Sequence, residues 1–147
     1  MRHHLLSLTG VLLAAGLGAP CSRPATPPPA TQDTVRVTEA VRVTDVDLGL
    51  GLDADKRVKD KTDHFSPSET IYVSVKTEGA APTATLKTRW TFQDGQVVHE
   101  ASQTIAPTGT AVTEFHVSNA AGWPNRSYKV EVFLNGSSVE TENFKVG

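Results

Sequence analysis

From about residue 46 to the end of the chain, large side chains recur at every second position. Six rows show this spacing: Val46, Leu48, Leu50 and Leu52; Ile71, Val73 and Val75; Leu86, Thr88, Trp90 and Phe92; Phe115 and Val117; Tyr128, Val130, Val132 and Leu134; Phe144 and Val146. Successive side chains of a strand point to opposite faces, whereas an amphipathic helix repeats its apolar residues every 3–4 positions. The alternation predicts half-buried β-strands throughout.

Turn signals separate these strands. Asp94-Gly95 is a hairpin turn signal and Asn135-Gly136 is a strong signal for a two-residue hairpin, because such turns need residues that tolerate positive φ. The chain is also expected to turn at residues 107–109 and to form a charged loop at residues 53–66. About seven or eight short strands with frequent turns predict an all-β, antiparallel sandwich.

Besides this alternation, three segments resemble those of known proteins: HFSPSETIYVSV at residues 64–75, RWTFQDG at 89–95, and GWPNRSYKVEVFLNG at 122–136. With the closing FKVG, they resemble a small immunoglobulin-like β-sandwich domain of bacterial exported lipoproteins, over residues 45–147. In such sandwiches a tryptophan on the third main strand is often buried, and a tyrosine near the start of the penultimate strand forms a corner. Trp90 and Tyr128 stand at these places. The resemblance lends the chain no catalytic residues.

The first twenty residues have the pattern of a signal peptide. Arg2 and two histidines precede an apolar run at residues 5–17. A run of this length is too short to cross a hydrocarbon core of about 30 Å as a helix, but it suits the apolar region of an export signal. We therefore expect residues 1–20 to be a signal peptide.

Cys21 is the single cysteine of the chain and directly follows this segment. The sequence LGAPC at residues 17–21 resembles the lipobox of bacterial lipoproteins, which implies that Cys21 is lipidated and begins the mature protein. Pro20 departs from the family pattern, which has a small residue there. Soluble secretion and an uncleaved anchor remain alternatives. Ser22 at the second mature position resembles outer-membrane sorting.

A proline-rich stretch follows the cysteine. Residues 21–34 contain Pro24, Pro27, Pro28 and Pro29 and have little apolar content, which favours a disordered, polyproline-like spacer. At about 3.1 Å per residue, thirteen such residues reach roughly 40 Å. Residues 35–44, within the imperfect repeat VRVTEAVRVTD, are expected to form an extended arm or a leading strand, and residues 45–147 the sandwich domain.

Charge and composition restrict the function. The formal net charge is −2, and no lysine or arginine cluster supplies the basic surface that nucleic-acid binding needs. His64, His99 and His116 lie on separate segments, and no GxSxG motif is present. We therefore expect no catalytic residues, no cofactor and no enzyme activity.

A metal site is not expected either. The segment DADKRVKD at residues 53–60 begins like a calcium loop, but Arg57 and Val58 stand where an EF-hand loop needs an oxygen ligand and a glycine. A minor alternative is a different calcium loop that uses Asp53, Asp55, Asp60 and Asp63.

These features favour a non-catalytic binding or assembly domain, tethered to the membrane through its lipid anchor in the bacterial cell envelope. The expected location is the outer membrane, facing the periplasm, and the expected ligand is a protein partner bound at sheet edges or end loops. Residues 35–43 are a candidate for a donated or unpaired strand.

The alternative is a carbohydrate-binding module that recognises envelope glycans through Trp123 or Tyr72. Trp123 could either present a binding surface or cap the core, because it precedes Pro124 at an end of the sandwich.

Overall fold

The computed structural model describes residues 40–147, so Cys21, the segments predicted as signal peptide and linker, and residues 35–39 of the expected arm lie outside the described residues. The strands are β1 (Arg42–Leu52), β2 (Val58–Lys61), β3 (His64–Phe65), β4 (Ile71–Glu78), β5 (Ala84–Phe92), β6 (Val97–Ile105), β7 (Ala111–Val117), β8 (Arg126–Leu134) and β9 (Ser137–Val146). No helix that could span a membrane occurs within residues 40–147.

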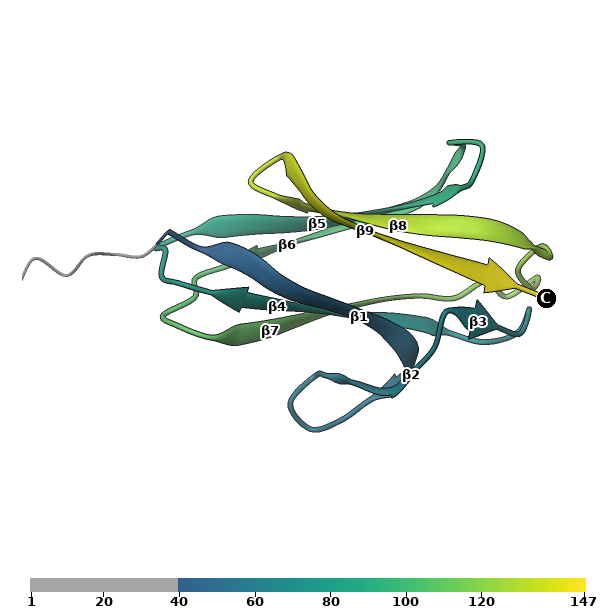
Figure 1. The fold of residues 1–147 in the computed structure, drawn as a ribbon, viewed down its shortest axis with the longest axis horizontal. Coiled ribbons are helices and arrows are strands. Elements are labelled where there is room, and N and C mark those ends of the chain that lie inside the picture. Colours follow the sequence, from purple (N-terminus) through teal and green to yellow (C-terminus); the bar gives the residue numbers. More distant parts are fainter. Residues whose placement is uncertain (1–39) are drawn as a thin grey trace, which may run out of the picture. The chain divides into compact units, whose positions relative to one another are not determined.

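The strands form two sheets packed face to face (Figure 1). The first sheet has the order β2-β1-β4-β7, and the second has the order β3-β9-β8-β5-β6. Neighbouring strands run antiparallel, except that the short β3 runs parallel to β9. The predicted all-β sandwich is confirmed.

The described strands number nine, not seven or eight, because the predicted charged loop at residues 53–66 contains both β2 and β3. β2 pairs with the end of β1, where Leu52 faces Val58. β3 pairs with the end of β9 over only two positions. Strands this short carry no readable alternation, so the sequence pattern missed them.

The first strand also begins earlier than the boundary at residue 45. β1 starts at Arg42 and pairs with β4 from its first residue, with a bulge between Val43 and Asp45. The bulge shifts the alternation at this point, which is why the sequence pattern was clear only from Val46 onward. The last three residues of the expected arm, 42–44, are therefore part of β1.

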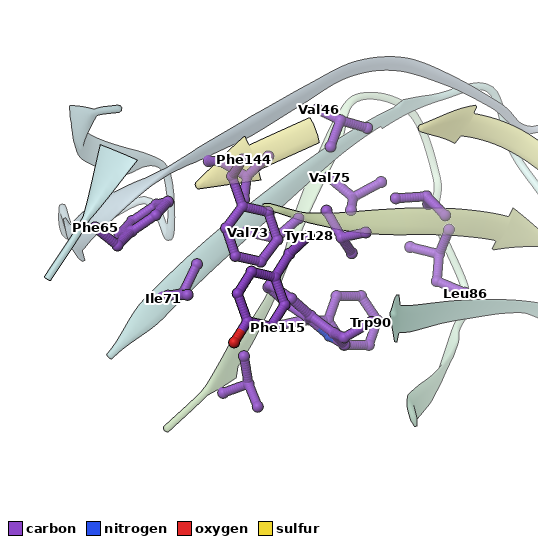
Figure 2. Close-up of a cluster of buried hydrophobic side chains, with 14 of the residues drawn as sticks. Val46, Phe65, Ile71, Val73, Val75, Leu86, Trp90, Phe115, Tyr128 and Phe144 are labelled. Atoms are coloured by element: carbon purple, nitrogen blue, oxygen red, sulfur yellow. The ribbon is translucent and has the colours of Figure 1, made fainter. Parts of the chain in front are cut away.

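The core lies between the two sheets, and side chains from both meet there (Figure 2). Most of the predicted inward residues are buried: Val46, Leu48, Ile71, Val73, Val75, Leu86, Thr88, Trp90, Phe115, Val117, Tyr128, Val130, Val132, Leu134, Phe144 and Val146. Leu50, Leu52 and Phe92 are only half-buried. The backbone at Gly51 has φ of 69°, and there β1 leaves the sandwich to enter the β1–β2 hairpin.

The β1–β2 hairpin lies against the outer surface of the first sheet. Val58 is buried, although it lies outside the main core cluster. Its backbone N–H donates to the Oγ of Ser74 on β4, at 3.3 Å. Lys61 forms an ion pair with Asp47 at 2.5 Å. Gly49 lies under this hairpin, and a Cβ atom built there would be 2.0 Å from the carbonyl oxygen of Asp60.

Gly49→Ala is therefore expected to destabilise the domain by about 1–3 kcal/mol, the usual cost of forcing extra atoms into a packed site. The clash is with backbone, and with Cγ1 of Val58 at 2.6 Å, so the hairpin must move. Chemical denaturation of the two proteins measures the change. Gly147→Ala is the matched control, because a Cβ there is 3.9 Å from its nearest neighbours. Equal stability of the Gly49 variant and the parent would contradict the packing of the hairpin.

Candidate binding surface

Trp123 belongs to the core. Its side chain is 5% exposed, and its ring meets Tyr128 edge to face at 5.9 Å. The indole N–H donates to the carbonyl of Glu69 at 3.1 Å, and the backbone N–H donates to the carbonyl of Pro67 at 2.7 Å. Trp123 thus joins the loop before β4 to the loop before β8. Trp123 is therefore not available as a surface residue of a binding site. Of the two alternatives from the sequence, it caps the core.

Tyr128 forms the predicted corner. Its hydroxyl donates to the carbonyl of Pro124 at 2.7 Å, the bond back to an upstream carbonyl that is typical of a tyrosine corner. Its ring stacks on Phe144 at 5.2 Å between centroids. Burial raises the pKa of the Tyr128 hydroxyl. The corner and Trp123 therefore tie the loops at this end of the sandwich to the core.

Tyr72 lies on the outer surface of the first sheet, where β4 and β7 place it directly across from His116. The two rings are 5.6 Å apart between centroids and tilted by 37°. The Nδ1 of His116 is 3.2 Å from a carboxylate oxygen of Glu114, and the His116 side chain is 57% exposed. The structure therefore groups the His116 imidazole and the Glu114 carboxylate with Tyr72. The sequence pattern did not predict this grouping.

The edge of β9 is a second candidate surface. On one side, β9 pairs with β8 over the whole strand. On the opposite side, which is the edge meant here, β3 pairs only with Lys145 and Val146. The N-terminal half of β1 lies along the same side of the sandwich, where Figure 1 shows β1 and β9 in front. Within residues 40–147, no strand pairs with residues 137–143 on this edge. Such an edge can accept another strand.

Carboxylates line this edge. Glu140 and Glu142 are on β9, in the alternation that also places Phe144 and Val146 toward the core. Burial raises the pKa of Glu142, and the negative charges of Glu140, Asp47 and Asp45 raise it further. Inward-facing charges at an edge strand discourage unselective pairing. The signal was readable in the sequence, because glutamates replace apolar residues at two inward positions of the last strand.

The raised pKa of Glu142 predicts a pH dependence. The folded state holds this proton more tightly than the unfolded state, so stability falls as pH rises from the ordinary glutamate pKa through the raised one. Glu142→Gln should therefore unfold at higher temperature than the parent at pH 7, with the difference shrinking toward about pH 4. Thermal melts across pH measure this. Glu140→Gln should act in the same direction but less. A constant difference at all pH values would contradict the prediction.

The aspartates of the proposed calcium loop do not converge. An oxygen of the Asp53 side chain accepts the backbone N–H groups of Asp55 and Arg57, both at 2.9 Å. This carboxylate therefore shapes the turn of the β1–β2 hairpin. Among residues 40–147, no group of three or more histidines, cysteines, aspartates or glutamates could hold a metal ion.

The three histidines of the described part of the chain occupy three different strands. His64 is on β3, with its Nδ1 at 2.8 Å from Asp63; His99 is on β6 and His116 on β7. The geometry thus places them in separate surroundings.

The two packed sheets, the buried Trp90 on β5 and the Tyr128 corner at the start of β8 define an immunoglobulin-like β-sandwich. An immunoglobulin-like protein from Pseudomonas aeruginosa superposes with a TM-score of 0.50 and 13% identity, over 76% of this chain and 99% of that one. At this identity the likeness concerns the fold. It confirms the resemblance to a small bacterial immunoglobulin-like domain.

Two further structures are similar to lesser degrees. The CARDB domain of a Pyrococcus furiosus protein, solved with di-metal ions, has a TM-score of 0.45 at 12% identity, over 73% of this chain and 89% of that one. A β-glucosidase from Listeria innocua, solved with isofagomine, has a TM-score of 0.47 at 11% identity, over 74% of this chain but 16% of the enzyme. No family model and no curated protein matches the chain.

Proposed function

We propose that this protein is a non-catalytic binding module of the bacterial cell envelope, tethered through a lipid on Cys21 and engaging a protein partner. The tether places it at the outer membrane, facing the periplasm, with the proline-rich segment as spacer. The partner contributes an extended segment that pairs with an edge of the sandwich.

The observation that carries this proposal is the partly filled edge of β9. β3 already pairs there over two positions, with the N–H of Lys145 donating to the carbonyl of Asp63 at 2.8 Å. The neighbouring residues 137–143 have the same kind of edge, and within residues 40–147 no strand pairs with them there. A partner's strand would pair with residues 137–143 of β9, beyond the end of β3. Its main-chain hydrogen bonds to β9 would supply affinity. The carboxylates of Glu140 and Glu142 favour a partner segment that carries lysine or arginine.

Site-specific photo-crosslinking in the envelope tests this proposal. A photoreactive residue at Thr141, which is exposed on β9, should yield a crosslinked product larger than the protein itself. The same residue at Asp94, in the turn between β5 and β6, is the matched control and should yield none. Glu140→Lys with Glu142→Lys should weaken the product at Thr141. Equal products at both positions, or none at Thr141, would contradict binding at this edge.

One observation favours glycan recognition as a second candidate function. Tyr72 and His116 form a small, partly exposed aromatic pair beside a carboxylate, which is the kind of surface on which a sugar ring can stack and hydrogen-bond. Trp123 is buried and cannot add to it. A glycan array with the parent and with Tyr72→Ala distinguishes the two functions: a glycan bound by the parent and lost in the variant would favour this one.

A further inference from the structure

The edge of the second sheet opposite β3 and β9 is formed by β6. Among the strands of residues 40–147, β6 pairs only with β5, and its side chains are exposed or half-buried along its whole length. Val97, at its beginning, is 52% exposed. From His99 to Ile105 the strand keeps an unbroken register with β5, and an irregularity between Trp90 and Thr91 leaves Val98 as the extra residue of a bulge. The regular edge therefore comprises residues 99–105.

Beyond the bulge at Val98, this edge lacks the features that usually prevent pairing. Residues 99–105 contain no proline, lysine or arginine, residues that blunt sheet edges in many proteins. Their one acidic side chain, Glu100, is held on the sheet surface by Arg89 at 2.7 Å and Lys87 at 2.9 Å. The β9 edge, in contrast, has inward-facing glutamates, and at the edge of β7 the carbonyl of Glu114 accepts a hydrogen bond from Gln103.

We propose that two copies of this chain associate through β6, in an antiparallel pair with twofold symmetry centred on Ser102. In this register Ser102 faces Ser102 of the second copy, Glu100 faces Thr104, Ala101 faces Gln103, and His99 faces Ile105. The second sheets of the two copies then form one continuous ten-stranded sheet. The interface is isologous, so it closes after two copies.

The bulge and the charges select this register. A pair centred on Ala101 would draw the bulge at Val98 into the ladder, where it would break the regular pairing. A pair centred on Glu100 would place the two Glu100 carboxylates directly opposite each other, which is unfavourable. With Ser102 at the centre, the two Glu100 residues are about 13 Å apart along the strands, beyond the screening length of about 8 Å at physiological salt.

A seven-residue pair buries less area than a standard protein interface, so the dimer is weak and depends on concentration. The pairing does not require the lipid anchor or the proposed protein partner, because β6 and β9 are at opposite edges of the second sheet. An anchor would raise the local concentration of the chains. The interface and the proposed function can therefore succeed or fail separately.

Charge substitutions at the twofold axis test the interface. In the full chain with Cys21→Ser, sedimentation velocity over a concentration series should show a monomer–dimer equilibrium. Ser102→Glu alone and Ser102→Lys alone place like charges opposite each other and should each abolish the dimer. An equimolar mixture of the two variants should restore it, which a folding defect could not explain. Ser137→Glu, at the start of β9, is the control and should leave the dimer unchanged.

A crosslinking experiment checks the register. With Cys21→Ser in the background, an introduced cysteine is the only thiol in the chain. Ser102→Cys should be crosslinked by a bismaleimide of about 8 Å reach, because side chains directly opposite have Cβ atoms about 5 Å apart. Thr104→Cys should not, since the two copies of this position are about 13 Å apart. A chain that stays monomeric at all concentrations, a dimer unaffected by both charge variants, or equal crosslinking at both positions would overturn the proposal.

Discussion

Trp90→Ala is expected to lower the free energy of unfolding by about 3–5 kcal/mol, the range for removal of a large buried aromatic side chain. Trp90 is 2% exposed and lies centrally on β5, between β6 and β8. Its ring meets Phe144 edge to face at 5.8 Å, so the substitution removes a contact to β9 as well. β5 pairs with β6 on one side and with β8 on the other, so its backbone cannot move to close the cavity.

The indole N–H of Trp90 also donates to the Oγ1 of Thr88 at 3.3 Å, so the variant leaves a buried hydroxyl with one partner fewer. Urea denaturation followed by circular dichroism measures the loss. His116→Ala is the control and should change the stability by no more than about 0.5 kcal/mol, because the His116 side chain is largely in solvent. Similar losses in the two variants would mean that the inward and outward faces are assigned wrongly.

Cys21→Ser is expected to move the protein almost entirely from the membrane fraction to the soluble fraction. The expectation rests on the single cysteine and on its position between an apolar run and a proline-rich spacer. Serine keeps the size of the side chain but lacks the thiol that would carry the lipid. Fractionation followed by blotting measures the distribution, and mass spectrometry of the parent should detect the added acyl chains.

Ser22→Ala is a suitable control, since it changes the neighbouring residue and leaves the thiol in place. Membrane attachment that is the same in the parent and in Cys21→Ser would contradict lipidation at this residue. Separation of the inner and outer membranes by density tests the expected outer-membrane location independently.

Within the described part of the chain, alternation predicted strands such as β4, β5, β7 and β8 because one face of each is buried in the core. The row of Tyr128, Val130, Val132 and Leu134 is buried as expected, since a strand at the centre of a sheet has neighbours on both sides. The hairpin signals at Asp94-Gly95 and Asn135-Gly136 also correspond to turns, with positive φ at Gly95, Asn135 and Gly136. These properties depend on residues close together in sequence.

The structure was needed where a residue's surroundings come from distant segments. Trp123 precedes a proline in a polar region, and only the packing of the loops near Pro67 and Glu69 shows that its ring is buried. β2 and β3 are too short to show a period, and their partners are β1 and β9. The edge strands could also be recognised only in the structure, because the sequence of a strand does not indicate on which side it lacks a neighbouring strand.

The sequence by itself determined the sandwich class and the inward face of the strands whose apolar residues alternate. Both follow from the period of two and from turn chemistry, which are local properties of the chain, whereas the position of the corner tyrosine followed from the resemblance to an immunoglobulin-like domain. The tertiary structure alone decided that β6 and part of β9 lack a partner strand on one side within residues 40–147, that Trp123 is buried and that the β1–β2 hairpin covers Gly49. These depend on contacts between residues far apart in sequence, which are fixed only when the two sheets pack together.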